Sequence, residues 1–157
     1  MFWEMVSLLG EPLMWTGVSL ILVGIYFMLR RFRYEKRLLL KGFLKILLPS
    51  FLVNILLVLL IKVVYPVPRP CTMDNPFCMS DPSFPSGHTV SITTAVTSAV
   101  LGYRRKEIIL LYILPFLVAV SRVMLGVHTV ADVGAGIIIG IVIPLVLYMR
   151  FKEWFRK

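Results

Sequence analysis

Long apolar runs separated by short polar or charged segments make up most of this sequence. Five runs can be followed, at about residues 6–29, 43–65, 86–103, 108–125 and 130–149. An α-helix needs about 20 residues to cross the hydrocarbon core of a bilayer, because each residue adds about 1.5 Å. Each run is close to that length, so the pattern predicts an all-α fold, a polytopic transmembrane helix bundle with five spans.

The first dozen residues leave the number of spans open. Glu11 and Pro12 interrupt the first apolar run near its start, and proline removes a backbone donor from a helix interior. Residues 1–12 therefore fit either a short helix at the membrane interface or part of a sixth, broken span. We expect residues 1–157 to form a single integral-membrane domain.

Composition agrees with a membrane protein. Hydrophobic residues make up 59% of the 157 residues, and the mean hydropathy is +0.88, whereas soluble domains are usually about 45–50% apolar. These values argue against a soluble globule, a disordered chain and a disulfide-rich secreted scaffold.

The distribution of positive charge predicts the orientation of the bundle. Fourteen of the 17 Lys and Arg residues lie within residues 30–45, 104–106 and 150–157, which share one side if five spans alternate. The positive-inside rule makes that side cytoplasmic, so the loops at about 66–85 and 126–129 face the periplasm or outside. The net charge of +9 thus follows from topology in the cytoplasmic (inner) membrane and requires no nucleic acid partner.

Five ionisable residues stand at the outer ends of the predicted spans, where the charge rule does not require them: Lys62, Arg69, His88, Arg122 and His128. Lys62 and Arg69 alone would fit cations whose side chains extend to the interface. However, an ionisable residue at the edge of a span is costly and points to function. Three cations at one face make a site for a phosphate-sized anion.

The start of the third span adds chemistry at the same face. It reads Pro85, Ser86, Gly87 and His88. The free N–H groups of a helix start can bind an anion, and His88 would lie beside that anion. The same residues also fit a plain helix cap with a histidine at the interface.

His128 and Asp132 open the fifth span and share a helix face, because they are four residues apart. A carboxylate behind an imidazole fixes its tautomer and leaves the other nitrogen free as a nucleophile or base. A structural pair at the helix start is the alternative. The residues alone do not decide which histidine is the nucleophile, although Asp132 favours His128. The sequence has no cluster of Cys or carboxylates suited to a metal, so it predicts metal-independent phosphoryl transfer without a cofactor.

Three segments together resemble the signature of a known family. Residues 62–70 follow K-x6-RP, residues 85–88 are PSGH, and residues 121–132 follow SR-x5-H-x3-D. In this order they are similar to the type 2 phosphatidic acid phosphatase superfamily, the lipid phosphate phosphatases. The compact chain resembles its small bacterial members, which include lipid A 1-phosphatases and phosphatidylglycerophosphate phosphatases. Many members have six spans, whereas two apolar runs instead of three precede Lys62 here.

The resemblance implies a role for each matching residue. His128 would attack phosphorus and form a phosphohistidine, and Asp132 would orient it. His88 would protonate the leaving oxygen and then activate water. The residues implied to contact the phosphate or its surroundings are Lys62, Arg69, Ser86, Gly87, Ser121 and Arg122.

The outward loop from Cys71 to Phe84 would overhang this site. Cys71 and Cys78 are close in sequence, and the extracytoplasmic side permits disulfides. The sequence fits either of two alternatives: a disulfide between Cys71 and Cys78, or two free thiols.

The leading function is hydrolysis of a phosphomonoester or pyrophosphate on a bacterial envelope lipid, with that lipid and the bilayer as partners. Lipid A 1-phosphate and phosphatidylglycerol phosphate lead, and undecaprenyl pyrophosphate and phosphatidic acid also fit. A non-catalytic lipid- or anion-binding protein or a transporter is the alternative. The filled catalytic positions and the lack of a visible inverted repeat weigh against it. Vanadate haloperoxidase chemistry is disfavoured because those relatives are soluble.

Overall fold

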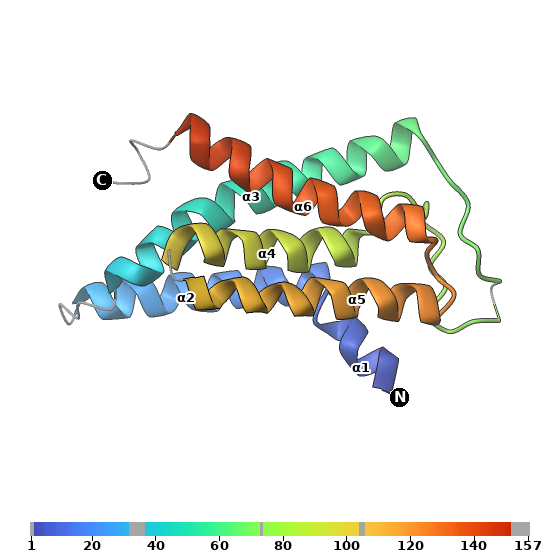
Figure 1. Ribbon diagram of the computed structural model, residues 1–157, viewed down its shortest axis with the longest axis horizontal. Helices are drawn as coiled ribbons and strands as arrows, with labels where there is room; N and C mark the ends of the chain where they lie inside the picture. Colours follow the sequence, from blue (N-terminus) through green and yellow to red (C-terminus); the bar gives the residue numbers. More distant parts are fainter. Residues whose placement is uncertain (1, 32–36, 73, 104–105, 152–157) are drawn as a thin grey trace.

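The fold is all-helical, as the apolar runs predict. A computed structural model describes residues 2–31, 37–72, 74–103 and 106–151, and these ranges contain no strand (Figure 1). The helices in chain order are α1 (Phe2–Leu8), α2 (Pro12–Arg31), α3 (Arg37–Val64), α4 (Gly87–Tyr103), the 3-10 helix η1 (Lys106–Tyr112), α5 (Ile113–Met124) and α6 (Val130–Arg150).

α4 is the central helix of the bundle. It contacts α3, α5 and α6, and every residue from Thr89 to Ala99 is buried. Two of its hydroxyl groups bond within the helix: Thr93 donates to the carbonyl of Thr89 at 2.6 Å, and Thr94 donates to that of Val90 at 2.7 Å. The hydroxyl of Thr97 lies 2.9 Å from that of Tyr112, whereas Oγ of Ser98 has no partner among the described residues. Hydrogen bonds of this kind reduce the cost of burying polar side chains in the centre of the bundle.

Two glycines bring α6 close to α4. A Cβ on Gly140 would lie 2.5 Å from Cβ of Thr93, and one on Gly136 would lie 2.9 Å from Cβ of Thr89. Both distances are shorter than side-chain atoms tolerate, so the approach requires glycine. The packing fixes the first turn of α4 beside the first turn of α6, where the sequence places the two histidines.

Four of the five predicted spans are matched by segments long and apolar enough to cross a membrane. These segments are Pro12–Leu29, Leu40–Val64, Glu107–Met124 and Val130–Arg150. α4 has 17 residues and is enclosed by them. The transmembrane bundle is therefore supported, whereas a fifth crossing by α4 stays a prediction.

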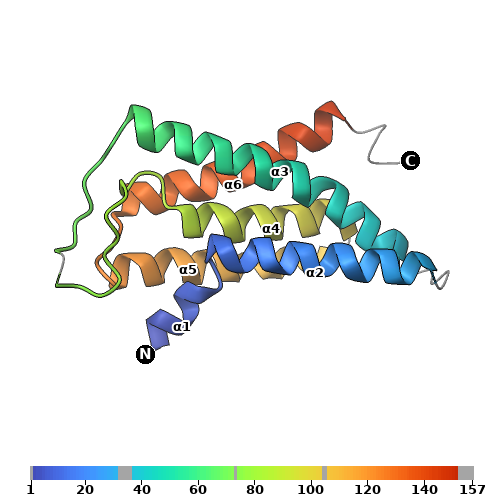
Figure 2. The same ribbon diagram turned by 180° about the vertical axis from the view of Figure 1, so that it is seen from behind.

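The N-terminal residues form a separate short helix. α1 has seven residues, and residues 9–11 separate it from α2. It packs against α5 and projects away from the bundle axis (Figures 1 and 2). This arrangement fits the short-helix alternative better than a sixth span.

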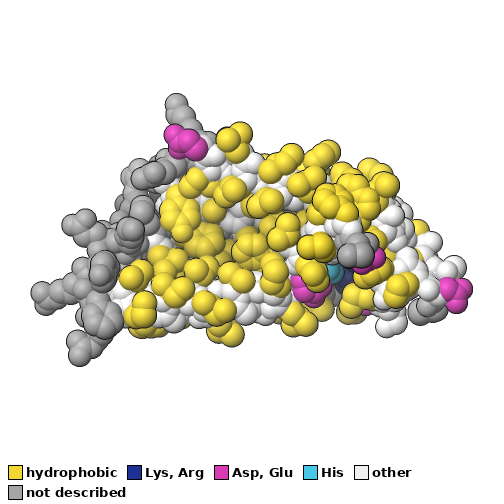
Figure 3. All heavy atoms as spheres, turned by 90° about the horizontal axis from the view of Figure 1, so that it is seen from below, with side chains coloured by type: hydrophobic (Ala, Val, Ile, Leu, Met, Phe, Trp, Pro, Cys, Tyr) yellow, Lys and Arg dark blue, Asp and Glu magenta, His cyan; other side chains and the backbone are white. Residues whose placement is uncertain are grey.

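The two ends of the bundle have different roles. The α3–α4 and α5–α6 connections lie at one end, near α1, while the end of α2, the start of α3 and the end of α6 lie at the other (Figures 1 and 2). Seven of the 14 basic residues expected at that second end lie outside the described residues. Apolar side chains cover much of the surface between the ends (Figure 3). The candidate site is at the first end.

Candidate active site

His128 is positioned by the turn and cap that begin α6. Gly126 has a φ of 68° in the turn after α5, a conformation that favours glycine. The Thr129 side chain accepts from the N–H of Asp132 at 3.3 Å, and the Thr129 N–H donates to Oδ2 of Asp132 at 2.7 Å. That oxygen lies 3.5 Å from Nδ1 of His128. The two residues thus meet as expected, but not on one helix face, because His128 precedes α6 and Asp132 reaches it as part of the helix cap.

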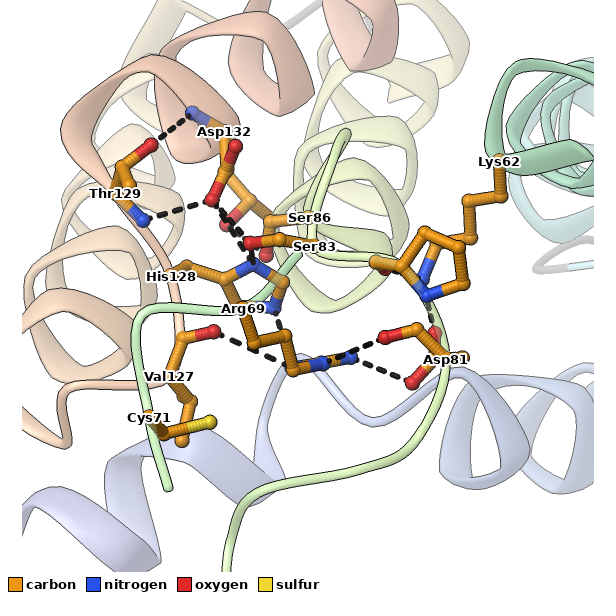
Figure 4. Close-up of polar contacts among 12 residues, drawn as sticks. Lys62, Arg69, Cys71, Asp81, Ser83, Ser86, Val127, His128, Thr129 and Asp132 are labelled. Carbon is orange, nitrogen blue, oxygen red and sulfur yellow. Dashed lines mark hydrogen bonds and ion pairs between the residues drawn. The ribbon is translucent and has the colours of Figure 1, made fainter. Parts of the chain in front are cut away.

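Ser83 lies between these two side chains (Figure 4). Its hydroxyl donates to Oδ2 of Asp132, and its oxygen lies 3.2 Å from Nδ1 of His128. Its N–H donates to the carbonyl of Val67 at 2.7 Å, which fixes this part of the loop. Sequence reasoning missed Ser83, because its partners lie 45 and 49 residues later in the chain. Both contacts of the Ser83 hydroxyl are shorter than the 3.5 Å between Oδ2 of Asp132 and Nδ1 of His128. Ser83 therefore bridges the carboxylate and the imidazole.

Arg69 determines which nitrogen of His128 carries the proton. Nη1 of Arg69 lies 3.3 Å from Nε2 of His128 and 3.4 Å from the carbonyl oxygen of Val127. A guanidinium only donates hydrogen bonds, so Nε2 must present a lone pair and Nδ1 must hold the proton. The Nδ1 proton then points to Ser83 and Asp132, while the lone pair faces the cation.

The surroundings of His128 keep it neutral. Burial lowers the pKa of His128 from 6.5 to about 4, the charges of Arg69 and Arg122 act in the same direction, and Asp132 opposes them. The imidazole is therefore unprotonated at neutral pH. A buried, neutral imidazole with a fixed tautomer is suited to nucleophilic attack.

Lys62 and Arg69 meet at one carboxylate (Figure 4). Lys62 stands in the last turn of α3, where its ammonium bonds the Asp81 carboxylate and donates to the carbonyl of Pro82 at 2.8 Å. Nη2 of Arg69 lies 2.7 Å from Oδ1 of Asp81. Burial raises the pKa of Asp81, but the two cations outweigh that effect and hold the pKa below its usual value. Asp81, which sequence reasoning missed, is thus an ionised partner of two predicted phosphate ligands.

Arg122 supplies a third cation from the last turn of α5. It is 3% exposed, and its charge acts on His128. Nη1 donates to Oγ of Ser7 in α1 at 2.5 Å, whereas Nε has no partner among the described residues. A buried donor without a partner is costly, and a bound anion would satisfy it.

His88 faces a cavity of about 220 Å³ from the first turn of α4. Its Nε2 lies 2.8 Å from Oε2 of Glu11, a residue that sequence reasoning did not place in the site. Figure 3 shows a histidine in a hollow of the apolar surface, between acidic side chains. The charged and titratable residues that line the cavity are Glu11, Lys62, Arg69, Asp81, His88 and His128.

Three other predicted site residues have different surroundings. Gly87 lines the cavity. The N–H of Ser86 donates to the carbonyl of Asp132 at 3.1 Å, which joins the starts of α4 and α6. The hydroxyl of Ser121 donates to the carbonyl of Val118 at 2.7 Å, within its own helix. Contact of Ser86 or Ser121 with a phosphate therefore stays a prediction.

The loop that carries Arg69 is held by a disulfide and by a hydrogen bond to the α5–α6 connection. Cys71 and Cys78 form a disulfide with their Cα atoms 5.9 Å apart, so of the two alternatives the structure has the bridge. Nδ2 of Asn75 donates to the carbonyl of Leu125 at 2.9 Å. The disulfide closes the α3–α4 connection on itself, and the bond from Asn75 holds it against the α5–α6 connection, which helps to place Arg69 beside His128.

Metal ligands are not grouped in the part of the chain that the structure describes. No three His, Cys, Asp or Glu side chains there are arranged to hold a metal ion. The groups that surround the cavity are instead fixed cations, which can stabilise phosphate oxygens. Metal independence itself stays a prediction.

Comparison with known proteins identifies the family. The profile of the PAP2 superfamily matches residues 43–156, which contain all three signature segments. The chain belongs to the PAP2 superfamily. Among curated proteins, none matches the sequence significantly. The family that the three segments resemble is thus confirmed for this PAP2 protein.

Two solved structures resemble this PAP2 protein along most of its length. LpxE from Aquifex aeolicus has a TM-score of 0.70 and 27% identity, over 92% of this chain and 82% of that chain. A transmembrane PAP2-type phosphatidylglycerolphosphate phosphatase from Bacillus subtilis has a TM-score of 0.70 and 25% identity, over 97% of this chain and 75% of that chain. Family and neighbours together support a membrane lipid phosphatase.

Proposed function

We propose that this PAP2 protein removes phosphate from a lipid headgroup through a phosphohistidine intermediate on His128. The observation that carries the proposal is the pairing around that imidazole. Its Nε2 lone pair lies beside Arg69, and its Nδ1 proton lies toward Ser83 and Asp132. An imidazole held by a carboxylate in one tautomer is the arrangement that nucleophilic catalysis requires.

In the first step, Nε2 of His128 attacks phosphorus. The N–P bond forms as the bond from phosphorus to the leaving oxygen breaks, and His88 gives that oxygen its proton. The imidazole becomes positively charged, and Asp132 stabilises this charge directly and through Ser83. Lys62, Arg69 and Arg122 stabilise the charge that spreads over the equatorial oxygens, which is why we propose that no metal is needed.

In the second step, water replaces the histidine. His88, now neutral, takes a proton from water as its oxygen attacks phosphorus. The N–P bond breaks, its electron pair returns to Nε2, and inorganic phosphate leaves. His88 and His128 are then in their starting protonation states.

The proposed substrate is a lipid whose chains stay in the bilayer while its phosphate enters the cavity. The cavity has an apolar wall along α3 that includes Phe51, Ile55 and Val58. Resemblance to LpxE, a lipid A 1-phosphatase, and to a phosphatidylglycerolphosphate phosphatase favours lipid A 1-phosphate and phosphatidylglycerol phosphate. We place the site on the periplasmic face of the inner membrane, with α4 as the fifth span.

The test measures phosphate release by the purified protein in detergent from lipid A 1-phosphate, phosphatidylglycerol phosphate, phosphatidic acid and undecaprenyl pyrophosphate, with EDTA present. Rapid quenching at alkaline pH, where phosphohistidine persists, should trap labelled phosphate on the wild-type protein. His128→Ala should abolish the label and reduce turnover on the order of 10³-fold or more.

Glu107→Gln serves as the control, because Glu107 is exposed in η1 and outside the site. It should keep full label and turnover. A label that survives in His128→Ala and disappears in His88→Ala would reverse the two roles. No phosphate release from any lipid would instead favour a non-catalytic anion-binding protein.

A further inference from the structure

The proton donor His88 has a carboxylate partner from outside the three signature segments. Oε2 of Glu11 lies 2.8 Å from Nε2 of His88. Glu11 belongs to the connection between α1 and α2, before the residues 43–156 that the PAP2 profile covers. The two proposed catalytic histidines are therefore each paired with a carboxylate, His128 through Nδ1 and His88 through Nε2.

The backbone around Glu11 is fixed against the site. Its N–H donates to the carbonyl of Leu8 at 3.0 Å, and its carbonyl accepts from the N–H of Trp15 at 3.2 Å. A Cβ on Gly10 would lie 2.8 Å from the carbonyl oxygen of His88 and 2.9 Å from its Cβ. Because the chain passes this close to α4, the contact of Glu11 with His88 follows from the packing of the whole segment.

The charges around His88 make such a partner necessary. Burial disfavours the charged form of its imidazole most, and the cations Arg122, Arg69 and Lys62 act in the same direction from α5, the α3–α4 connection and α3. The carboxylate of Asp81 also lines the cavity, but it is paired with Lys62 and Arg69. Surrounded by cations, His88 would lose its proton easily, and a general acid without a proton cannot act.

We propose that Glu11 is the positioning residue of His88, holding its Nε2 proton so that the imidazole stays protonated and delivers its Nδ1 proton to the leaving oxygen. The proposal rests on the proposed function, because it needs His88 as the proton donor. The Nδ1 proton moves to the leaving oxygen in the first step, and Nδ1 recovers a proton from water in the second. The Nε2 proton stays between His88 and Glu11 throughout.

The test compares two substrates that differ in their need for an acid. A lipid phosphate has a poor alkoxide leaving group, whereas p-nitrophenyl phosphate has a good one that needs little protonation. Glu11→Gln should lower kcat for the lipid roughly 10- to 100-fold, within the range of general acid catalysis, and should change kcat for p-nitrophenyl phosphate less than about threefold. The basic limb of the kcat–pH profile for the lipid should move to lower pH. Glu11→Asp, which keeps the charge, should recover part of the loss.

Glu107→Gln makes the same chemical change away from the site and should alter neither substrate. Equal losses of kcat on both substrates in Glu11→Gln, or no loss on either, would overturn the proposal. Hydrolysis of p-nitrophenyl phosphate by the variant shows that it folds. Absence of a phosphohistidine label in the wild-type protein would contradict the proposed function, whereas a labelled wild type with an unaffected Glu11→Gln would contradict only this inference.

Discussion

Asp81 holds Arg69 through two contacts: Oδ1 of Asp81 lies 2.7 Å from Nη2 of Arg69, and the carbonyl oxygen of Asp81 lies 3.0 Å from Nε. The other carboxylate oxygen bonds Lys62. A phosphate that binds to these two cations would therefore compete with the Asp81 carboxylate for them. The carboxylate is 39% exposed at the cavity, so it can turn away when substrate arrives.

The first prediction is that Asp81→Asn binds phosphate compounds more tightly. A neutral amide competes less for Lys62 and Arg69, so KM for the lipid and the inhibition constant for vanadate should each fall roughly three- to tenfold. Asp74→Asn removes a charge from an exposed position in the same loop and should change neither value. An increase of KM in Asp81→Asn would mean that Asp81 organises the two cations and does not compete with the phosphate.

The second prediction concerns Ser83, whose hydroxyl connects His128 and Asp132. Ser83→Ala should lower kcat roughly 10- to 100-fold, as removal of a group that orients a catalytic residue typically does, with little change in KM. Rapid-quench kinetics should place the loss in formation of the phosphohistidine. Ser80→Ala, at an exposed position three residues earlier, is the matched control. A kcat in Ser83→Ala equal to that of the control would show that the direct contact of His128 with Asp132 suffices.

The third prediction is that the acid limb of the kcat/KM–pH profile lies at unusually low pH. In the proposed mechanism the unprotonated form of His128 is the nucleophile, and the pKa of His128 is lowered to about 4. As pH falls, kcat/KM should therefore hold to about pH 5 and decline only as His128 is protonated near its lowered pKa. Arg69→Gln removes a charge that lowers this pKa, so its acid limb should lie at higher pH. A wild-type limb near pH 6.5 would contradict the burial of His128.

Contacts within one helix turn could be predicted from the sequence, and contacts across the fold could not. The spacing of His128 and Asp132 places them one helix turn apart, and the structure brings them within 3.5 Å, although His128 lies just before α6. Ser83 and Asp81 lie in an irregular loop, where no periodicity indicates which side chain turns inward. Their positions depend on how the whole α3–α4 connection folds over α6, which is a property of the tertiary structure.

The N-terminal segment shows the same limit. Glu11 and Pro12 predict a break in the first run, and the structure has one between α1 and α2. The contact of Glu11 with His88 could not be predicted. The position of Glu11 depends on the packing of α1 against α5 and on the hydrogen bond from Arg122 to Ser7. The lengths of most helices could be predicted from the apolar runs. The burial of α4 on every face could not, because it depends on the helices that pack around it.

The last prediction tests the packing that holds the two histidines together. Gly140→Ala adds a Cβ 2.5 Å from Cβ of Thr93, so α6 and α4 must move apart, at a cost of about 1–3 kcal/mol. Thermal unfolding in detergent should show a lower Tm, and kcat should fall because the first turns of these helices carry the site. Gly134→Ala is the matched control on the same helix, since its Cβ meets nothing within 4 Å. It should keep activity and gain up to about 1 kcal/mol, because alanine favours a helix over glycine. Equal Tm values for the two variants would show that α4 and α6 are less closely packed than these distances require.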